Sequence, residues 1–211
     1  MEQLSFFVTF EGIDGCGKST QAGLLEAALK NRGYRVKHTF EPGGTELGQK
    51  LRPILLTQDG LPLSPFAELL LFSADRRQDI DEIIQPSLKR GEIVIGERFA
   101  DSSIAYQGIG GGLGKKRVER LMNVITSGLC PDLTFLLDID PAVSLARKTK
   151  LDRIEQRGAF LDTVRSAFLE MAKSQKDRFV LINAAQPQSN IAETVLKIAL
   201  ERLSQRRCYH G

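Results

Sequence analysis

A nine-residue phrase near the start of the chain most constrains how it folds: Gly12-Ile13-Asp14-Gly15-Cys16-Gly17-Lys18-Ser19-Thr20. It matches the pattern G-x-x-x-x-G-K-[ST], follows an apolar run at 6–10 and precedes a run with helical spacing. A strand, a glycine-rich loop and a helix in this order form a phosphate-binding loop, whose backbone N–H groups and helix N-terminus face phosphate oxygens. We therefore expect these nine residues to bind a nucleoside triphosphate, with Lys18 on its β- and γ-phosphates and the Ser19 hydroxyl as a ligand of Mg²⁺.

Length and composition limit what surrounds this loop. The 211 residues, 42% of them hydrophobic, predict a single domain, residues 1–211, with a sizeable core. A formal net charge of +3 is too small to indicate a nucleic-acid partner, and no apolar run approaches the length of a membrane span. The start, Met1-Glu2-Gln3, lacks the cationic region of a signal peptide, and the three cysteines are far apart. We expect a cytoplasmic protein that binds neither nucleic acid nor membrane.

Strand-like and helical runs alternate along the chain. Short apolar runs predict five strands, at 5–11, 35–40, 92–96, 133–138 and 179–183. Helical spacing predicts helices at 18–32, from Pro65 through about Ile84, from Pro141, and at 191–203. This alternation is typical of an α/β fold in which a five-stranded parallel sheet carries helices on both faces. Ligands of such a sheet bind at the carboxyl ends of its strands.

The end of the third predicted strand carries the pair Glu97-Arg98. A carboxylate at this edge can hold Mg²⁺ through water, and the neighbouring guanidinium can stabilise phosphoryl oxygens. Taken alone, such a pair is more often a surface ion pair. Its place at a strand terminus behind a phosphate-binding loop favours the catalytic interpretation.

Two further segments suggest a second ligand. Phe72 and Arg76 are four residues apart and share one helix face, where a ring and a guanidinium can stack on a base and donate to its carbonyl. The same spacing also fits a core phenylalanine and a solvated arginine, and by itself it favours that plainer interpretation. Glu41-Pro42-Gly43-Gly44-Thr45 predicts a tight loop before a helix that contains Arg52, which faces either the same cleft or solvent.

A basic stretch at about 147–158 includes Arg147, Arg153 and Arg157. It fits an ordinary charged helix surface. It equally fits a lid that closes over phosphates, excludes water and supplies an arginine. The count of charges does not choose between the two.

Taken in order, these motifs resemble those of bacterial thymidylate kinases over essentially the whole chain. The segments that carry the resemblance are the Asp14-bearing loop, Glu41-Pro42-Gly43-Gly44-Thr45, Phe72-Ser73-Ala74-Asp75-Arg76, Glu97-Arg98-Phe99 with Ser102-Ser103 and Ala105-Tyr106-Gln107, and Leu151-Asp152-Arg153-Ile154-Glu155. The resemblance implies a P-loop nucleoside monophosphate kinase fold with a short lid. It also implies phosphorylation of dTMP to dTDP by ATP and Mg²⁺, in dTTP biosynthesis, by a homodimer.

The resemblance also implies roles for single residues. The dTMP-binding set is Asp14, Glu41, Arg52, Phe72, Arg76, Arg98, Ser103, Tyr106 and Gln107. Phe72 stacks on thymine, Arg76 donates to its O4, and Tyr106 lies where a 2′-hydroxyl would fall. Ser103 and Gln107 lie near the base edge, and Arg52 and Arg98 hold the acceptor phosphate. Lys18, Arg98 and Arg153 are the catalytic cations, and Ser19 and Glu97 are the Mg²⁺ residues. Because Cys16 leaves the loop without a cation of its own, the chain resembles the subtype whose catalytic arginine lies in the lid.

Three residues differ from the usual family pattern. Glu97 stands where aspartate is usual and reaches one methylene further, Phe99 replaces a tyrosine, and Phe40 stands where an arginine often precedes the Glu-Pro-Gly-Gly phrase. Two other functions remain as alternatives: a kinase for another nucleoside monophosphate, and a P-loop switch without an acceptor. No Asn-Lys-x-Asp sequence occurs, which argues against a GTPase.

Overall fold

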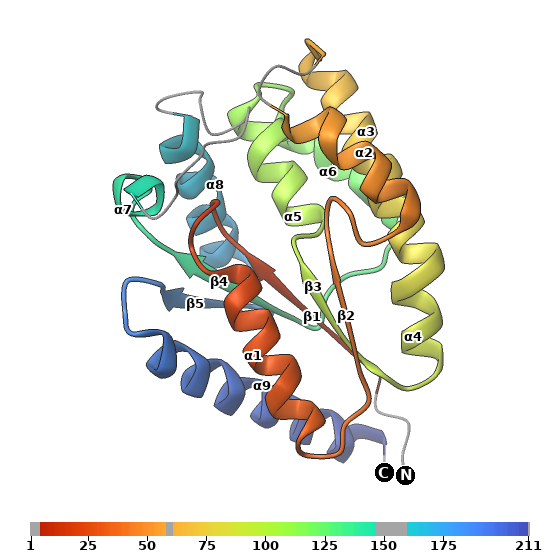
Figure 1. Ribbon diagram of the computed structural model, residues 1–211, viewed down its shortest axis with the longest axis vertical. Coiled ribbons are helices and arrows are strands. Elements are labelled where there is room, and N and C mark those ends of the chain that lie inside the picture. The colour runs from red at the N-terminus through yellow and green to blue at the C-terminus, as the bar shows by residue number, and fades with distance from the viewer. Residues whose placement is uncertain (1–4, 58–60, 147–159, 211) are drawn as a thin grey trace.

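The computed structural model describes residues 5–57, 61–146 and 160–210, which contain a five-stranded parallel sheet (Figure 1). Its strands are β1 (Phe6–Glu11), β2 (Val36–Phe40), β3 (Ile93–Glu97), β4 (Leu133–Asp138) and β5 (Phe179–Asn183). Their order is β2-β3-β1-β4-β5, and every neighbouring pair is parallel. The predicted five-stranded parallel sheet is therefore confirmed, with the first strand in its middle.

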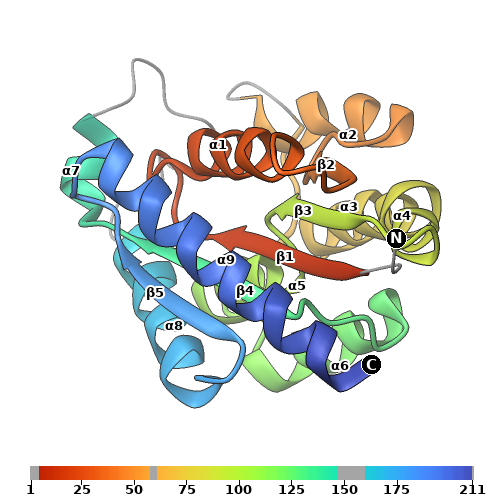
Figure 2. The same cartoon turned by 90° about the horizontal axis from the view of Figure 1, so that it is seen from below.

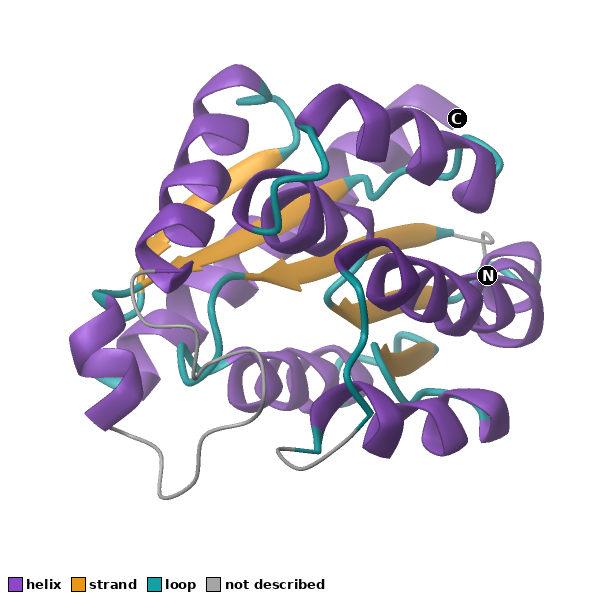
Figure 3. Ribbon diagram, turned by 90° about the horizontal axis from the view of Figure 1, so that it is seen from above, coloured by secondary structure: helices purple, strands orange, loops and turns teal. Residues whose placement is uncertain are grey.

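The central strand β1 is buried along its whole length, as a parallel strand covered on both faces must be. Val8 lies opposite Ile95 of β3 and Leu133 of β4. Seen from above, the strand arrows point toward the same edge of the molecule (Figure 3). The phosphate-binding loop and the segment after Glu97 both begin at this edge.

Helices cover both faces. They are α1 (Lys18–Lys30), α2 (Glu46–Leu56), α3 (Pro65–Asp79), η1 (Ile80–Ile84), α4 (Gln85–Lys89), α5 (Ala100–Ser103), η2 (Ile104–Gly110), α6 (Lys115–Thr126), α7 (Pro141–Ala146), α8 (Phe160–Ser174) and α9 (Gln188–His210). Figure 2 shows α1 on one side of the sheet and α5, α6 and α8 on the other, while α9 packs against α1 and β4. In the described ranges no helix is both long and apolar enough to cross a bilayer.

Several predicted boundaries are wrong. The long helix does not end near Ile84, because η1 is a stretch of π-helix that leads directly into α4, which has Pro86 in its first turn. The first helix ends at Lys30 because residues 31–33 form a turn in which Gly33 has a φ of 83°. The last helix is longer than 191–203 at both ends.

Two apolar clusters hold the site edge in place. In the larger one, the ring of Phe10 stacks on that of Phe135, with 5.3 Å between centroids. The smaller one packs Phe99 edge-on against Phe7 at 5.1 Å, together with Ile80, Ile84 and Val94. Because Phe99 follows Arg98 directly, this cluster anchors the segment that carries the catalytic arginine candidate.

Candidate active site

The phosphate-binding loop adopts a conformation that requires its glycines. Gly12 has a φ of 134°, and a Cβ there would lie 2.6 Å from the Leu137 carbonyl oxygen. Gly15 and Gly17 also have positive φ, so the loop curls back on itself before α1 begins. The Lys18 amine lies inside this curl and donates to the carbonyl oxygens of Gly12 at 3.1 Å and Ile13 at 2.8 Å. The N-terminus of α1 receives no side-chain cap, which leaves its N–H groups facing outward as in an anion site.

The two residues predicted for Mg²⁺ lie in contact. The Ser19 hydroxyl, in the first turn of α1, donates to Oε2 of Glu97 at the end of β3. The other carboxylate oxygen, Oε1, lies 3.0 Å from Nε2 of His38 on β2. The hydrogen bond of Glu97 to His38 is the main cause that raises the pKa of His38, although burial opposes it. In the same pair, burial opposes ionisation of Glu97, but its bonds to His38 and Ser19 prevail and lower its pKa.

Arg98 joins the loop to the other strand end. Its guanidinium donates to Asp14 Oδ1 at 2.6 Å, the Gly12 carbonyl at 3.2 Å and the Ser102 hydroxyl at 3.1 Å. The Tyr106 hydroxyl donates to the other Asp14 oxygen at 3.2 Å, and its ring lies beneath the Arg98 guanidinium, 5.1 Å away. Burial raises the pKa of Tyr106, so the phenol stays neutral. Three residues from separate segments thus form one hydrogen-bonded group at the mouth of the loop.

A buried carboxylate that the sequence interpretation did not include supports Arg98 from behind. Glu11, the last residue of β1, accepts from the backbone N–H of Phe99 at 2.8 Å and from the Ser102 hydroxyl at 2.6 Å. Burial, with a contribution from Asp101, raises the pKa of Glu11 to about 7. A carboxylate at the carboxyl end of an apolar strand was the available signal, the same one that identified Glu97.

Arg76 is neither exposed nor solvated, so the plainer interpretation of it is wrong. Its side chain donates to Glu41 Oε2 at 2.8 Å, the Ser103 hydroxyl at 2.7 Å and the Phe99 carbonyl at 2.8 Å. Phe72, one turn earlier on α3, is half-buried and reaches both the core and the cavity. The helix spacing therefore does place this pair on one face, as predicted.

More carboxylates lie behind Arg76. Asp79 accepts from the Thr39 hydroxyl at 2.6 Å, and Asp75 accepts from the Gly43 N–H at 3.1 Å. Burial raises the pKa of Asp75 to about 6 and that of Asp79 to about 7, and it raises the pKa of Glu41 well above its usual range. The positive charge of Arg76 acts on all three carboxylates and lowers the pKa of each, against the effect of burial.

Arg52 approaches the site from α2. It donates to the Pro42 carbonyl at 2.5 Å, and its guanidinium lies 5.7 Å from the centre of the Phe40 ring. Gln107, on η2, donates to Glu68 Oε1 at 3.0 Å, which leaves its amide oxygen as the remaining acceptor. A π-helical segment such as η2 often occurs at functional sites because it turns side chains out of the regular helical register.

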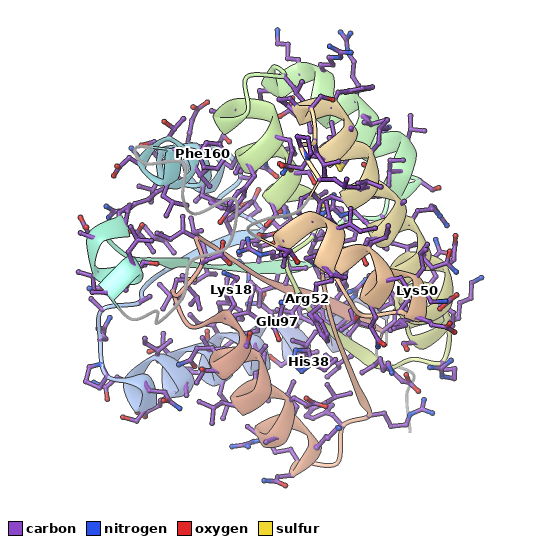
Figure 4. The ribbon with its side chains drawn as sticks, turned by 45° about the horizontal axis from the view of Figure 1, so that its top comes forward. Lys18, His38, Lys50, Arg52, Glu97 and Phe160 are labelled. Atoms are coloured by element: carbon purple, nitrogen blue, oxygen red, sulfur yellow. The ribbon has the colours of Figure 1, made fainter. Side chains whose placement is uncertain are left out.

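One cavity of about 630 Å³ joins these groups, a volume suited to small-molecule ligands. Most predicted site residues line it: Asp14, Gly15, Gly17, Lys18, Ser19, Thr20, Glu41, Arg52, Phe72, Arg76, Glu97, Arg98, Ser103, Tyr106 and Gln107. The three remaining loop residues that do not line the cavity are buried: Gly12, Ile13 and Cys16. Figure 4 shows Lys18, Arg52 and Glu97 around the middle of the molecule, with His38 beside Glu97. Arg153 lies outside the described residues.

A phosphate-binding loop that opens into a cavity of about 630 Å³ at the carboxyl edge of a five-stranded parallel sheet is typical of P-loop nucleotide-binding enzymes. The family model described as thymidylate kinase matches residues 10–195. A thymidylate kinase of Exiguobacterium sp. is 43% identical over 203 residues, which cover 94% of this chain and 96% of that protein. One of Thermosipho melanesiensis is 48% identical over 178 residues, covering 83% and 88%. The crystal structure of thymidylate kinase from Ehrlichia chaffeensis is similar with a TM-score of 0.79 and 36% identity, covering 93% of this chain and 99% of that one. The chain belongs to the thymidylate kinase family and is a nucleoside monophosphate kinase.

Proposed function

We propose that this chain transfers the γ-phosphoryl group of ATP to dTMP and forms dTDP in the cavity described above. The observation that carries the proposal is the group formed by Arg98, Asp14 and Tyr106, because it joins the ATP-binding loop to the base pocket. The acceptor phosphate is already ionised, so transfer needs no strong general base and no covalent intermediate. Catalysis then rests on positioning the phosphates and neutralising their charge, by Lys18 on the donor side and Arg98 on the acceptor side.

The base pocket supports thymine as the base. Phe72 offers a ring for stacking, and Arg76, held by Glu41 and Ser103, lines the same cavity as the residue that we expect to meet O4 of the base. The remaining acceptor of Gln107 suits the N3–H of thymine, whereas cytosine has no proton at N3. Arg52 lines the same cavity and supplies a second cation for the acceptor phosphate. Tyr106, packed against Arg98, lines the cavity as the residue that we expect a 2′-hydroxyl to press against.

Mg²⁺ fits the oxygen donors that the site presents. Ser19 and Glu97 are adjacent, both line the cavity, and both offer the hard oxygen ligands that Mg²⁺ prefers. Within the described ranges, no group of three or more His, Cys, Asp or Glu side chains is placed to hold a metal ion. When bound there, Mg²⁺ would neutralise charge on the β- and γ-phosphates.

The remaining parts of the proposal concern assembly and closure. A lid at about 147–158 supplies Arg153, because the loop has Cys16 where another subtype has a cation. The chain acts as one domain and as a homodimer in the cytoplasm. Support for the dimer comes from apolar side chains that stay exposed on three neighbouring helices, α2, α3 and α6: Leu47, Ile54, Phe66, Leu70 and Val124.

The test is a coupled assay with Mg·ATP and one acceptor at a time: dTMP, dUMP, UMP, CMP and AMP. We expect dTMP to give the highest kcat/KM, and excess EDTA to abolish turnover. Equal or faster turnover of another monophosphate would reassign the substrate. ATP hydrolysis that no acceptor stimulates would favour a P-loop switch instead.

A further inference from the structure

His38 is the residue of this site for which the sequence interpretation had no role. It lies on the edge strand β2, half-buried, with both ring nitrogens next to carboxylates. Nε2 lies 3.0 Å from Oε1 of Glu97, and Nδ1 lies 3.0 Å from Oε2 of Glu26 on α1. Lys30, one turn further along α1, donates to the other oxygen of Glu26 at 2.7 Å. The imidazole is therefore fixed from two sides.

The partner of His38 is the carboxylate that faces Ser19. Glu97 uses one oxygen for each neighbour, Oε1 for His38 and Oε2 for the Ser19 hydroxyl. A glutamate has one more rotatable bond than an aspartate, so its carboxylate loses more freedom when it is held in one place. The hydrogen bond to His38 restricts the Glu97 side chain before any cation binds. Because the imidazole N–H holds one carboxylate oxygen in place, the other oxygen stays directed toward Ser19.

We propose that His38 is a positioning residue, which holds the Glu97 carboxylate beside Ser19 in the orientation that a nucleotide-bound divalent cation requires. His38 and Glu97 then act as a pair: the histidine is useful because the carboxylate at position 97 is long enough to reach it. This inference rests on the proposed function. It concerns the cation site alone, however, and is tested without the acceptor.

The experiment measures Mn²⁺ binding to the protein saturated with ADP, from the electron paramagnetic resonance signal of free Mn²⁺. Loss of a group that orients a metal ligand lowers affinity by about 10–100-fold, and we expect His38→Leu to weaken Mn²⁺ binding by about tenfold. His38→Gln, whose side-chain amide reaches a similar position and can donate to Glu97, should restore most of this loss. Lys50→Ala, which breaks only the exposed pair of Lys50 with Glu46 on α2, is the matched control and should bind as the parent does.

A double-mutant cycle separates positioning from a general effect on the fold. In a Glu97→Asp background the shorter carboxylate no longer reaches His38, so His38→Leu should change Mn²⁺ affinity by less than twofold. Circular dichroism checks folding. If His38→Leu does not fold, His38→Asn replaces it, because asparagine keeps a polar group but is too short to reach Glu97.

Three results would overturn the proposal. They are Mn²⁺ binding by His38→Leu within twofold of the parent, an equal loss in both backgrounds, and a glutamine variant as weak as the leucine variant. Failure of the parent to phosphorylate dTMP would refute the proposed function instead, and it leaves the Mn²⁺ result unchanged.

Discussion

Replacing Arg76 with alanine should destabilise the protein severely, in addition to any effect on substrate binding. The Arg76 guanidinium is buried and bonds to Glu41, Ser103 and Phe99, so its removal breaks all of these hydrogen bonds at once. Asp75 and Asp79 lie behind it, and the pKa shifts of both include a lowering contribution from Arg76. The variant thus leaves buried carboxylates without the cation that they share.

The size of the effect follows from this burial. Removing one partner of a buried ion pair costs about 3–5 kcal/mol, because the other charge stays in a low-dielectric interior. For a chain of this size each kcal/mol lowers the melting temperature by about 2–4 °C, so we expect a drop of about 6–20 °C. The deficit should shrink at low pH. There the orphaned carboxylates take up protons, and their native pKa values are already raised by burial.

Urea unfolding followed by circular dichroism, at pH 7.5 and pH 5.5, measures this free energy of unfolding. The adjacent Arg77 provides a matched control, because its ion pair with Asp81 is on the surface and such pairs contribute about 1 kcal/mol or less. An Arg76→Ala variant that loses no more stability than Arg77→Ala would refute the argument. So would a deficit that is the same at both pH values.

Three further predictions concern catalysis, substrate choice and pH. Arg153→Ala should cut kcat at least about tenfold with a smaller change in KM, because an arginine that meets the phosphates on closure acts mainly in the transition state. Steady-state kinetics with both substrates saturating check this. A kcat within twofold of the parent would transfer the role to Arg147 or Arg157. The kcat/KM for dTMP should exceed that for UMP by about tenfold or more, because a 2′-hydroxyl would press on Tyr106 and a mismatched buried polar contact costs about 1–3 kcal/mol. Comparable values for the two substrates would contradict the assignment of the sugar pocket. The free energy of unfolding should fall as pH rises through about 7, because burial raises the native pKa of Glu11 to about 7 and the protonated carboxyl stabilises the folded state only at lower pH. In urea titrations at pH 5.5 and 8, Glu11→Gln should show a smaller fall in this free energy. An unchanged fall would assign the pH dependence to other groups.

Regular elements were predictable where a local signal was strong. β4 and β5 have the predicted bounds, because each is an apolar run between turns. The end of the long helix was not predictable, since proline normally stops a helix, whereas here the π-helical segment η1 leads into α4 with Pro86 in its first turn. Ile80 and Ile84 of this π-helical segment pack in one cluster with Phe7, which is a contact between distant parts of the chain.

The site shows the same division. Lys18, Ser19 and Glu97 follow from a motif and from the rule that ligands bind at strand ends, and the structure brings them together. Whether Arg76 is solvated or buried could not be read from its spacing, because its partners come from the 41–45 loop and from the segment after β3. His38 was missed for a related reason: a histidine in a strand acquires a role only from the strand and helix that pack beside it.

Arg98 shows how the fold enforces geometry that local preference disfavours. Its φ is 68°, in the left-handed region, which costs a non-glycine residue about 1–2 kcal/mol. The conformation persists because both sides are held: the Arg98 N–H donates to the Phe10 carbonyl at 2.9 Å, and the Phe99 N–H donates to buried Glu11. The Phe99 ring is at the same time packed against Phe7. The sharp turn between these anchors directs the guanidinium back over the phosphate-binding loop, where a regular continuation of β3 would carry it past the edge of the sheet. Glycine would relieve the strain at this position but has no guanidinium, so the fold must hold an arginine in a conformation suited to glycine.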